Sequence, residues 1–153
     1  MKLIENIPIE DKSLLPESSF FIPDEIKEEK KQEIIKEISE KQTAMLVDGD
    51  ADGIGAVAVV KEALEDVGFL ATSPNNLKED LERFKQVNSS KIFIVDLCPD
   101  TLQKIQPIKD IAKKADVYWY DHHKWNEEIL EAVEEMGVEI VIGDSEKVCS
   151  ADV

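Results

Sequence analysis

Short apolar runs recur along the chain and are separated by longer amphipathic stretches. The clearest runs are residues 44–47, 92–95 and 117–120. Runs of this length between polar turns are typical of buried strands, and the stretches between them have the length and spacing of helices. The alternation predicts an α/β fold of three layers, in which a mostly parallel sheet has helices on both faces.

The same pattern predicts the individual elements. Strands are expected at 43–47, 69–72, 91–95, 116–120 and 138–142, and helices at 24–41, 53–67, 77–87, 99–114 and 126–136. Gly68 and Gly137 stand where two of these helices should end, and the charged face of the helix at 24–41 should face solvent. Residues 1–23 contain three prolines and predict an irregular leader, so that one domain is expected over 24–153.

Composition narrows the class of protein. The 153 residues include 34 acidic and 18 basic side chains, a formal net charge of −16, so no general basic surface for nucleic acid is expected, although bound divalent metals can invert the local field. No apolar run approaches the roughly 20 residues of a membrane span, and no signal peptide is recognisable, so no membrane partner is expected. Cys98 and Cys149 fit no C-x-x-C pattern and indicate reduced thiols of a cytoplasmic protein.

The first apolar run leads into Asp48-Gly49-Asp50-Ala51-Asp52-Gly53. Three carboxylates within five residues repel one another unless a cation neutralises them. An EF-hand loop opens similarly but needs Glu at its twelfth position, where this chain has Val59, and the Gly-Lys-Ser/Thr of a phosphate-binding loop is missing. We therefore predict that Asp48, Asp50 and Asp52 bind metal; the alternative is that an Asp here only caps the next helix.

Two further polar clusters follow the later apolar runs. Asp96 comes after the run at 92–95, and Asp121-His122-His123 comes after the run at 117–120. Since ligands gather at the carboxyl ends of parallel strands, these side chains should converge with the first cluster at one edge of the sheet. Adjacent histidines point in different directions, so one can bind metal while the other faces substrate, and Asp121 can fix an imidazole tautomer. The alternatives are a turn-capping Asp96 and two surface histidines.

Together, Asp48-x-Asp50-x-Asp52-Gly53, Asp96 and Asp121-His122-His123 resemble the first three motifs of the DHH phosphoesterase superfamily, whose domain is Rossmann-like. The Asp-x-Asp-Ala-Asp-Gly form looks most like the RecJ-like exonuclease branch, because Ala44 stands where other branches usually carry His. The resemblance covers about residues 43–153. It implies manganese-dependent hydrolysis of phosphodiester bonds by a single-strand-specific exonuclease, with single-stranded nucleic acid as the partner.

The resemblance also implies roles for individual residues. Two manganese ions are expected, with magnesium as the alternative, because oxygen and imidazole ligands suit both metals and the histidine favours manganese. Asp48 and Asp52 would hold one ion, Asp50 and His122 the other, and Asp96 would bridge them. His123 would contact the scissile phosphate, and Asp121 would orient the histidine pair. Two ions about 3.5–4 Å apart would activate a water and stabilise the leaving oxygen.

The chain departs from the family pattern at its carboxyl end. A fourth motif, whose Asp completes the second metal site, and a DHH-associated C-terminal domain are expected in the family but not found before Val153; Asp144 and Asp152 are the late carboxylates. We therefore expect a truncated DHH domain over 24–153 and a protein partner that supplies the missing half. An apolar patch should lie exposed at the end of the strand at 138–142 and at a stub helix expected at 149–153.

Two other functions stay open. The first is a catalytically inactive RecJ-like scaffold of a replication or repair complex, which the missing fourth motif favours and the three retained motifs disfavour. The second is a phosphodiesterase for dinucleotides and very short oligonucleotides. The net negative charge favours this function, because it disfavours long polyanionic substrates more than short ones.

Overall fold

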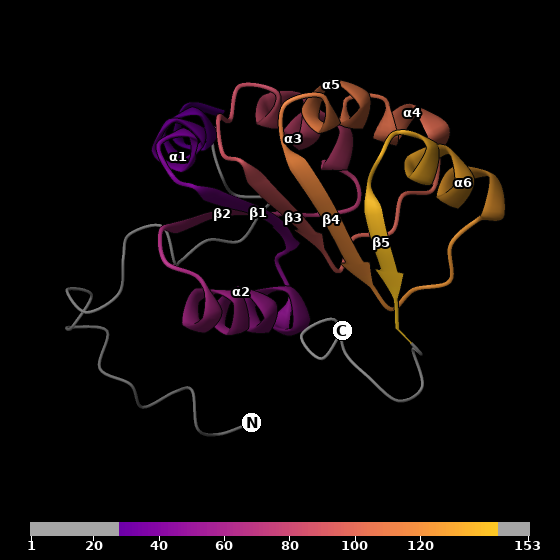
Figure 1. Ribbon diagram of the computed structural model, residues 1–153, viewed down its shortest axis with the longest axis horizontal. Helices are drawn as coiled ribbons and strands as arrows, with labels where there is room; N and C mark the ends of the chain where they lie inside the picture. The colour runs from indigo at the N-terminus through magenta and orange to yellow at the C-terminus, as the bar shows by residue number, and fades with distance from the viewer. Residues whose placement is uncertain (1–27, 144–153) are drawn as a thin grey trace.

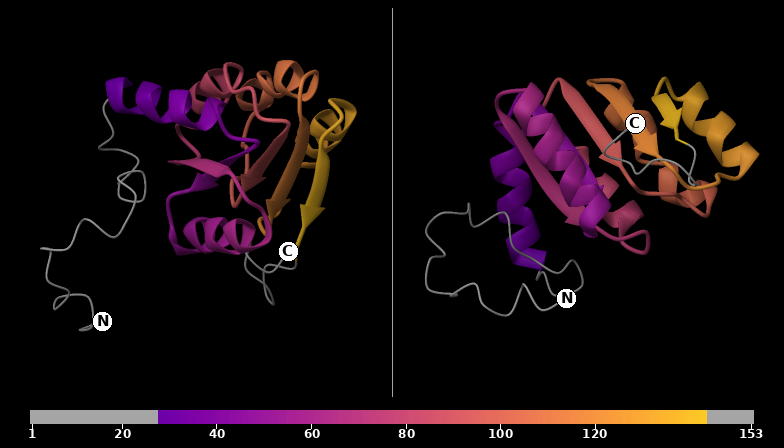
Figure 2. Two further views of the ribbon diagram at one scale, coloured as in Figure 1. Left: turned by 60° about the vertical axis from the view of Figure 1, so that its left-hand side comes forward. Right: turned by 90° about the horizontal axis from the view of Figure 1, so that it is seen from below.

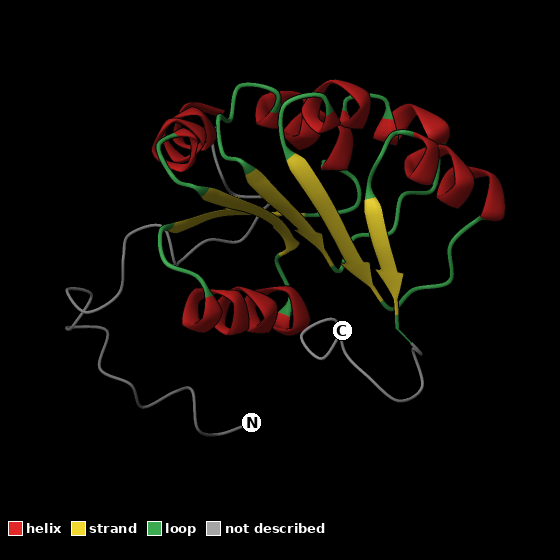
Figure 3. Ribbon diagram, viewed as in Figure 1, coloured by secondary structure: helices red, strands yellow, loops and turns green. Residues whose placement is uncertain are grey.

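The computed structural model describes residues 28–143, which form a five-stranded sheet with helices on both faces (Figures 1 and 3). The strands are β1 (Thr43–Asp48), β2 (Val67–Thr72), β3 (Lys91–Val95), β4 (Asp116–Asp121) and β5 (Glu139–Ile142). The helices are α1 (Glu28–Ser39), α2 (Ala51–Ala63), α3 (Leu77–Phe84), α4 (Leu102–Ile105), α5 (Ile108–Ala112) and α6 (Glu127–Glu135). Every strand pair is parallel, so the predicted α/β fold of three layers is confirmed.

Some sequence-based expectations lie outside the described residues. These are the irregular leader at 1–23, the first residues of the helix at 24–41, the late carboxylates Asp144 and Asp152, and Cys149. Among residues 28–143, no helix has both the length and the apolar character needed to cross a membrane.

The order of the strands explains why the two helical layers are unequal. The order is β2-β1-β3-β4-β5. The chain therefore crosses the sheet in one direction from β1 to β2, and in the opposite direction from β2 to β3, β4 and β5. Because crossovers between parallel strands are right-handed, connections that run in opposite directions lie on opposite faces of the sheet. Accordingly, α2 is the one described helix on its face of the sheet, whereas the other described helices lie on the opposite face (Figure 1).

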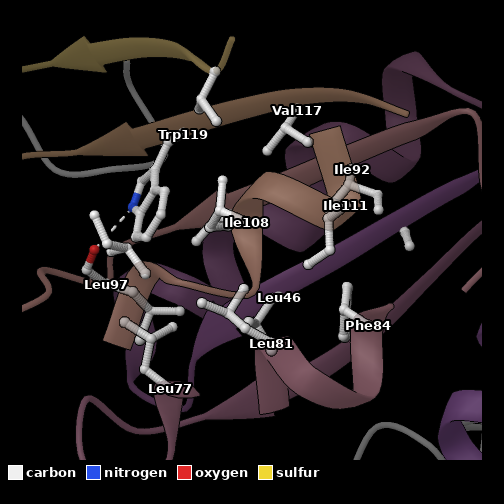
Figure 4. Packing of buried hydrophobic residues seen from close by; sticks show 14 of the residues in the cluster. Leu46, Leu77, Leu81, Phe84, Ile92, Leu97, Ile108, Ile111, Val117 and Trp119 are labelled. Atoms are coloured by element: carbon white, nitrogen blue, oxygen red, sulfur yellow. Dashed lines mark hydrogen bonds between the residues drawn. The ribbon is translucent and has the colours of Figure 1, made fainter. Parts of the chain in front are cut away.

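The larger core lies under α1 and α3–α6. Alternate residues of the central strands enter it, including Ile92 and Ile94 of β3 and Val117 and Trp119 of β4. Trp119 is fully buried, and its indole N–H donates to the carbonyl oxygen of Leu97 at 2.8 Å (Figure 4). A smaller core lies under α2, where Met45 and Val47 of β1 pack with residues of α2 and β2, as α2 contacts both strands.

The α2 face of the sheet is covered unevenly. In the view from below, α2 crosses the β1–β2 side, and no described helix crosses β3, β4 and β5 (Figure 2). On this part of the sheet the Phe93 ring stacks on Tyr118 and Tyr120, with centroids 5.1 and 6.0 Å apart. At the sheet edge, Val141 and Ile142 of β5 are 38% and 39% exposed. Two apolar side chains at the end of this strand are thus exposed, as predicted, whereas the predicted stub helix at 149–153 lies outside the described residues.

Two predicted helix boundaries are wrong for different reasons. α2 ends at Ala63, and Gly68 lies inside β2, where an added Cβ would come within 3.1 Å of the Ile38 and Lys41 side chains. Gly68 therefore permits close packing of the α1 end on β2, and it does not end a helix. The helix predicted at 99–114 is two short helices, because Pro107 between them has no backbone N–H to continue the hydrogen-bond ladder.

The prediction of a solvated charged face on the first helix is wrong at Lys31. This side chain is only 6% exposed, and its Nζ lies 3.2 Å from both carboxylate oxygens of Asp80. The apolar stripe of the same helix is as expected, because Ile34, Ile35 and Ile38 are buried.

Candidate metal centre

The predicted ligands lie where the connections of the sheet change direction. Asp48 is the last residue of β1, and Asp96 directly follows β3, the strand next to it. The chain leaves these two neighbouring strands toward opposite faces, so within residues 28–143 no connection between strands covers their carboxyl ends. In open parallel sheets this position is where ligands bind. The topology therefore places Asp48 and Asp96 at the point most suited to a site.

The loop from Asp48 to Gly53 turns sharply from β1 into α2. A Cβ at Gly53 would lie 2.0 Å from the carbonyl oxygen of Asp48, so only glycine fits there. Asp50 Oδ1 accepts a hydrogen bond of 2.9 Å from the Gly53 N–H and thereby caps α2. The helix-capping alternative thus holds for Asp50, which uses one oxygen for the cap and keeps the second oxygen for another ligand.

Asp96 has an unusual backbone. Its φ is +60°, in the left-handed region that non-glycine residues seldom occupy, and its N–H donates to the Tyr120 carbonyl oxygen at 2.9 Å. The side chain is 1% exposed, and its Oδ1 lies 3.3 Å from His122 Nε2 and 3.9 Å from His123 Nδ1. Strained conformations of this kind gather at functional sites. Here the strained conformation accompanies a carboxylate that lies close to both histidines.

Asp121 is fully buried and holds the histidine pair in place. Its Oδ1 accepts from the His122 backbone N–H at 2.8 Å and lies 2.6 Å from His123 Nδ1. Its Oδ2 accepts from the Trp125 indole N–H at 2.7 Å. Both oxygens of Asp121 are occupied by these contacts. Asp121 therefore orients the His123 imidazole, whose Nδ1 faces the carboxylate and whose Nε2 faces away from the carboxylate.

The two histidines face different directions. Their ring planes are inclined by 67° and their centroids lie 4.6 Å apart. His122 is mostly buried, and its Nδ1 finds no hydrogen-bond partner in the described part of the chain, although Asp52 Oδ2 lies 3.9 Å away. His123 is 47% exposed. One imidazole is thus available to an ion within the site, and the other reaches solvent.

The electrostatics of the site favour a bound cation. Burial raises the pKa of Asp48, and the neighbouring Asp50 carboxylate raises it further. Burial alone would lower the pKa of His123, but the hydrogen bond and charge of Asp121, with the charges of Asp96 and Asp48, raise it above its usual value. Neighbouring negative charge thus adds to the shift of Asp48 and causes that of His123, and a divalent ion would neutralise this charge.

Two groups of possible ligands share Asp96. In the first group, Asp48, Asp50 and Asp96 each offer an oxygen, and these atoms lie within 4.8 Å of one another. In the second, the same holds for ligand atoms of Asp96, Asp121, His122 and His123. Carboxylates with imidazole suit Mn²⁺ or Mg²⁺, and the buried His122 Nδ1 supports a ligand role for this ring. The donors of each group therefore fit a divalent ion, and Asp96 belongs to both groups.

The structure does not bring all predicted ligands equally close. Asp52 belongs to neither group, is 37% exposed at the side chain, and lies in the first turn of α2.

Trp125, which sequence reasoning missed, holds Asp121 from the loop before α6. Its spacing of four residues from Asp121 was the available signal, because a buried indole needs an acceptor for its N–H.

No protein-family model matches the chain, and no curated protein matches it.

Proposed function

We propose that this chain is a manganese-dependent phosphodiesterase of the RecJ-like type that acts on single-stranded nucleic acid. The observation that carries the proposal is the sharing of Asp96 between two ligand groups, one from the β1 end and one from the β4 end. Two divalent ions held by a common carboxylate are the arrangement used for in-line displacement at phosphorus. The resemblance of the three motifs to the DHH superfamily supports the same reaction class.

The residues divide into ligands and groups that meet the substrate. Asp48, Asp50 and Asp96 would hold one ion, and Asp96 with His122 would hold the other. This division places Asp50 with Asp48, whereas the motif resemblance assigns Asp50 to the ion of His122. Asp52, at the rim, is the further ligand that the motif resemblance assigns to the first ion. Bound ions would activate a water molecule and neutralise charge on the phosphate.

His123 is the residue suited to contact the phosphate. Its Nδ1 faces Asp121 at 2.6 Å, so its Nε2 is the nitrogen available to a substrate. The raised pKa favours the imidazolium form, in which Nε2–H donates to a phosphate oxygen. Asp121, held in turn by Trp125, would keep this orientation while the charge on the phosphate changes.

A second candidate is a phosphodiesterase for dinucleotides and very short oligonucleotides. The observation that favours it is the net charge of −16. An acidic surface repels a long polyanion but affects a substrate of two or three nucleotides less, because such a substrate reaches little beyond the metal-neutralised site.

The test is hydrolysis of a 5′-labelled dinucleotide and a labelled single-stranded oligonucleotide in Mn²⁺. Asp96→Asn keeps a residue that tolerates the left-handed backbone but removes the charge. Asp116→Asn, at the amino end of β4, makes the same change away from the site. We expect Asp96→Asn to lower turnover by about 100-fold or more and Asp116→Asn to leave it unchanged. Equal turnover in both variants would refute the proposal, and the product lengths distinguish the two substrate classes.

A further inference from the structure

A buried charged network lies beside the candidate metal centre. Its central member is Asp80 in the first turn of α3, which is fully buried. Lys31 Nζ lies 3.2 Å from both Asp80 oxygens, and Arg83 Nη1 lies 2.5 Å from Oδ1. Arg83 also pairs with Glu28 on α1. Two cations from two helices thus compensate one buried carboxylate.

The same carboxylate binds the end of strand β2. The Thr72 hydroxyl donates a hydrogen bond to Asp80 Oδ2. Thr72 is itself fully buried and is the last residue of β2. Asp80 therefore fixes the side chain of Thr72 and, with it, the position of the end of β2.

Thr72 in turn contacts the loop that carries the first ligands. It pairs in register with Asp48, and its carbonyl oxygen accepts a hydrogen bond of 3.0 Å from the Gly49 N–H. Gly49 lies between Asp48 and Asp50. A continuous series of contacts therefore runs from Lys31 through Asp80 and Thr72 to the peptide between these two ligands.

Stability alone is a weak reason for such a network. Burying an ion pair costs desolvation energy that its attraction often fails to exceed, and apolar replacements are frequently as stable. In some proteins a buried ionic network instead fixes one particular conformation. The other side of the same loop is already fixed by the close approach of Gly53 to Asp48. Thr72 supplies the matching support on the β2 side.

We infer that Thr72 and Asp80 are positioning residues for the first ligand group: Asp80 holds Thr72, and Thr72 holds the Gly49 peptide so that Asp48 and Asp50 face the same ion. This inference rests on the proposed metal-dependent function. The partners that surround a ligand usually change metal affinity by about 10–100-fold when they are removed.

The test uses Thr72→Val, which replaces the hydroxyl by a methyl group and keeps the β-branched shape. Thr72→Ser keeps the hydroxyl and is the rescue variant. Thr43→Val makes the same change at a buried threonine that begins β1, at the opposite end of the sheet. Mn²⁺ affinity is measured by isothermal titration calorimetry on each full chain. Amide hydrogen exchange of Gly49 is measured by NMR in the metal-free proteins.

We expect Thr72→Val to bind Mn²⁺ about 10-fold more weakly than the wild-type chain, and its Gly49 amide to exchange about fivefold to tenfold faster. Thr72→Ser and Thr43→Val should stay within about twofold of the wild type in both measurements. Asp80→Asn should change Gly49 exchange in the same direction as Thr72→Val.

The outcomes separate this inference from the function on which it rests. Gly49 exchange and Mn²⁺ affinity that are unchanged in Thr72→Val, or changed equally in Thr43→Val, would overturn the positioning role. The wild-type chain could bind no Mn²⁺ while Gly49 still exchanges faster in Thr72→Val than in the wild type. That result would overturn the proposed function and leave the support of the loop by Thr72 established.

Discussion

His122 Nε2 lies 3.3 Å from Asp96 Oδ1, so the residue that follows β4 and the residue that follows β3 face one another across the end of the sheet. The same Asp96 also lies within reach of Asp48 and Asp50 at the end of β1. One buried carboxylate thus connects three strand ends that are far apart in sequence.

Manganese should stabilise the folded chain. A ligand that binds only the native state at 100 times its Kd adds about 2.7 kcal/mol to the free energy of unfolding, which corresponds to several degrees in melting temperature for a chain of this size. His122→Ala and Asp50→Ala should each lose most of this gain, while Asp116→Asn should keep it. Calorimetric scans with and without Mn²⁺ measure the effect. A melting temperature that Mn²⁺ leaves unchanged in the wild-type chain would contradict the expectation.

Asp48→Asn should stabilise the metal-free protein. The pKa of Asp48 is raised by burial and by Asp50, so the folded state prefers the protonated carboxyl. The stability that this preference contributes is present at pH values below the pKa of the unfolded chain and is lost as pH rises through the raised pKa.

At neutral pH the ionised Asp48 therefore destabilises the metal-free fold, by less than about 1 kcal/mol because the group is partly exposed and screened. Urea unfolding at pH 7 should show a higher midpoint for Asp48→Asn than for the wild-type chain without metal. Adding Mn²⁺ should reverse the order, since the variant lacks one ligand. The same ranking with and without Mn²⁺ would argue against a ligand role for Asp48.

Trp125→Phe should lower activity more than its effect on stability explains. The change leaves Asp121 Oδ2 buried without the indole donor, which costs about 1–3 kcal/mol, and it releases the carboxylate that orients His123. Trp119→Phe is the matched control, because it also removes a buried indole hydrogen bond, to the Leu97 carbonyl. Urea unfolding and turnover are measured on both. We expect similar losses of stability but about 10-fold lower turnover only in Trp125→Phe; equal turnover in the two variants would show that Trp125 is only structural.

Cys98 should react slowly with alkylating reagents. Burial raises the pKa of its thiol to about 11, and the charges of Asp121 and Asp100 add to the shift. Since the thiolate is the nucleophile, the rate at pH 8 should be about 100-fold below that of an ordinary cysteine and should keep rising with pH. The rate of iodoacetamide labelling between pH 7 and 11 in a Cys149→Ser background tests this. A plateau near pH 9 would mean that the thiol does not sense its buried, acidic surroundings.

Much of the fold was predictable because its signals are local. A buried parallel strand is a short apolar run, and the runs at 44–47, 92–95 and 117–120 fall inside β1, β3 and β4. The proximity of Asp48, Asp96 and His122 was predictable for a topological reason, since each follows or ends a strand of one parallel sheet.

Contacts between distant segments were not predictable in this way. Lys31 and Asp80 are 49 residues apart, and nothing in the charged pattern around Lys31 shows that this one lysine is buried. Gly68 resembles a helix terminator in sequence, and only the path of α1 over β2 shows that it is needed for packing. Pro107, in contrast, carried a local signal for a helix break that the periodicity of its surroundings obscured.

The most direct test of a two-ion centre that Asp96 bridges is the stoichiometry of Mn²⁺ binding, measured by isothermal titration calorimetry on the metal-free chain and on Asp96→Asn. The account predicts two Mn²⁺ ions for each wild-type chain and a loss of affinity at both sites in Asp96→Asn, because both ligand groups contain this carboxylate. A wild-type chain that binds no Mn²⁺, or an Asp96→Asn variant that binds two ions with unchanged affinity, would contradict it.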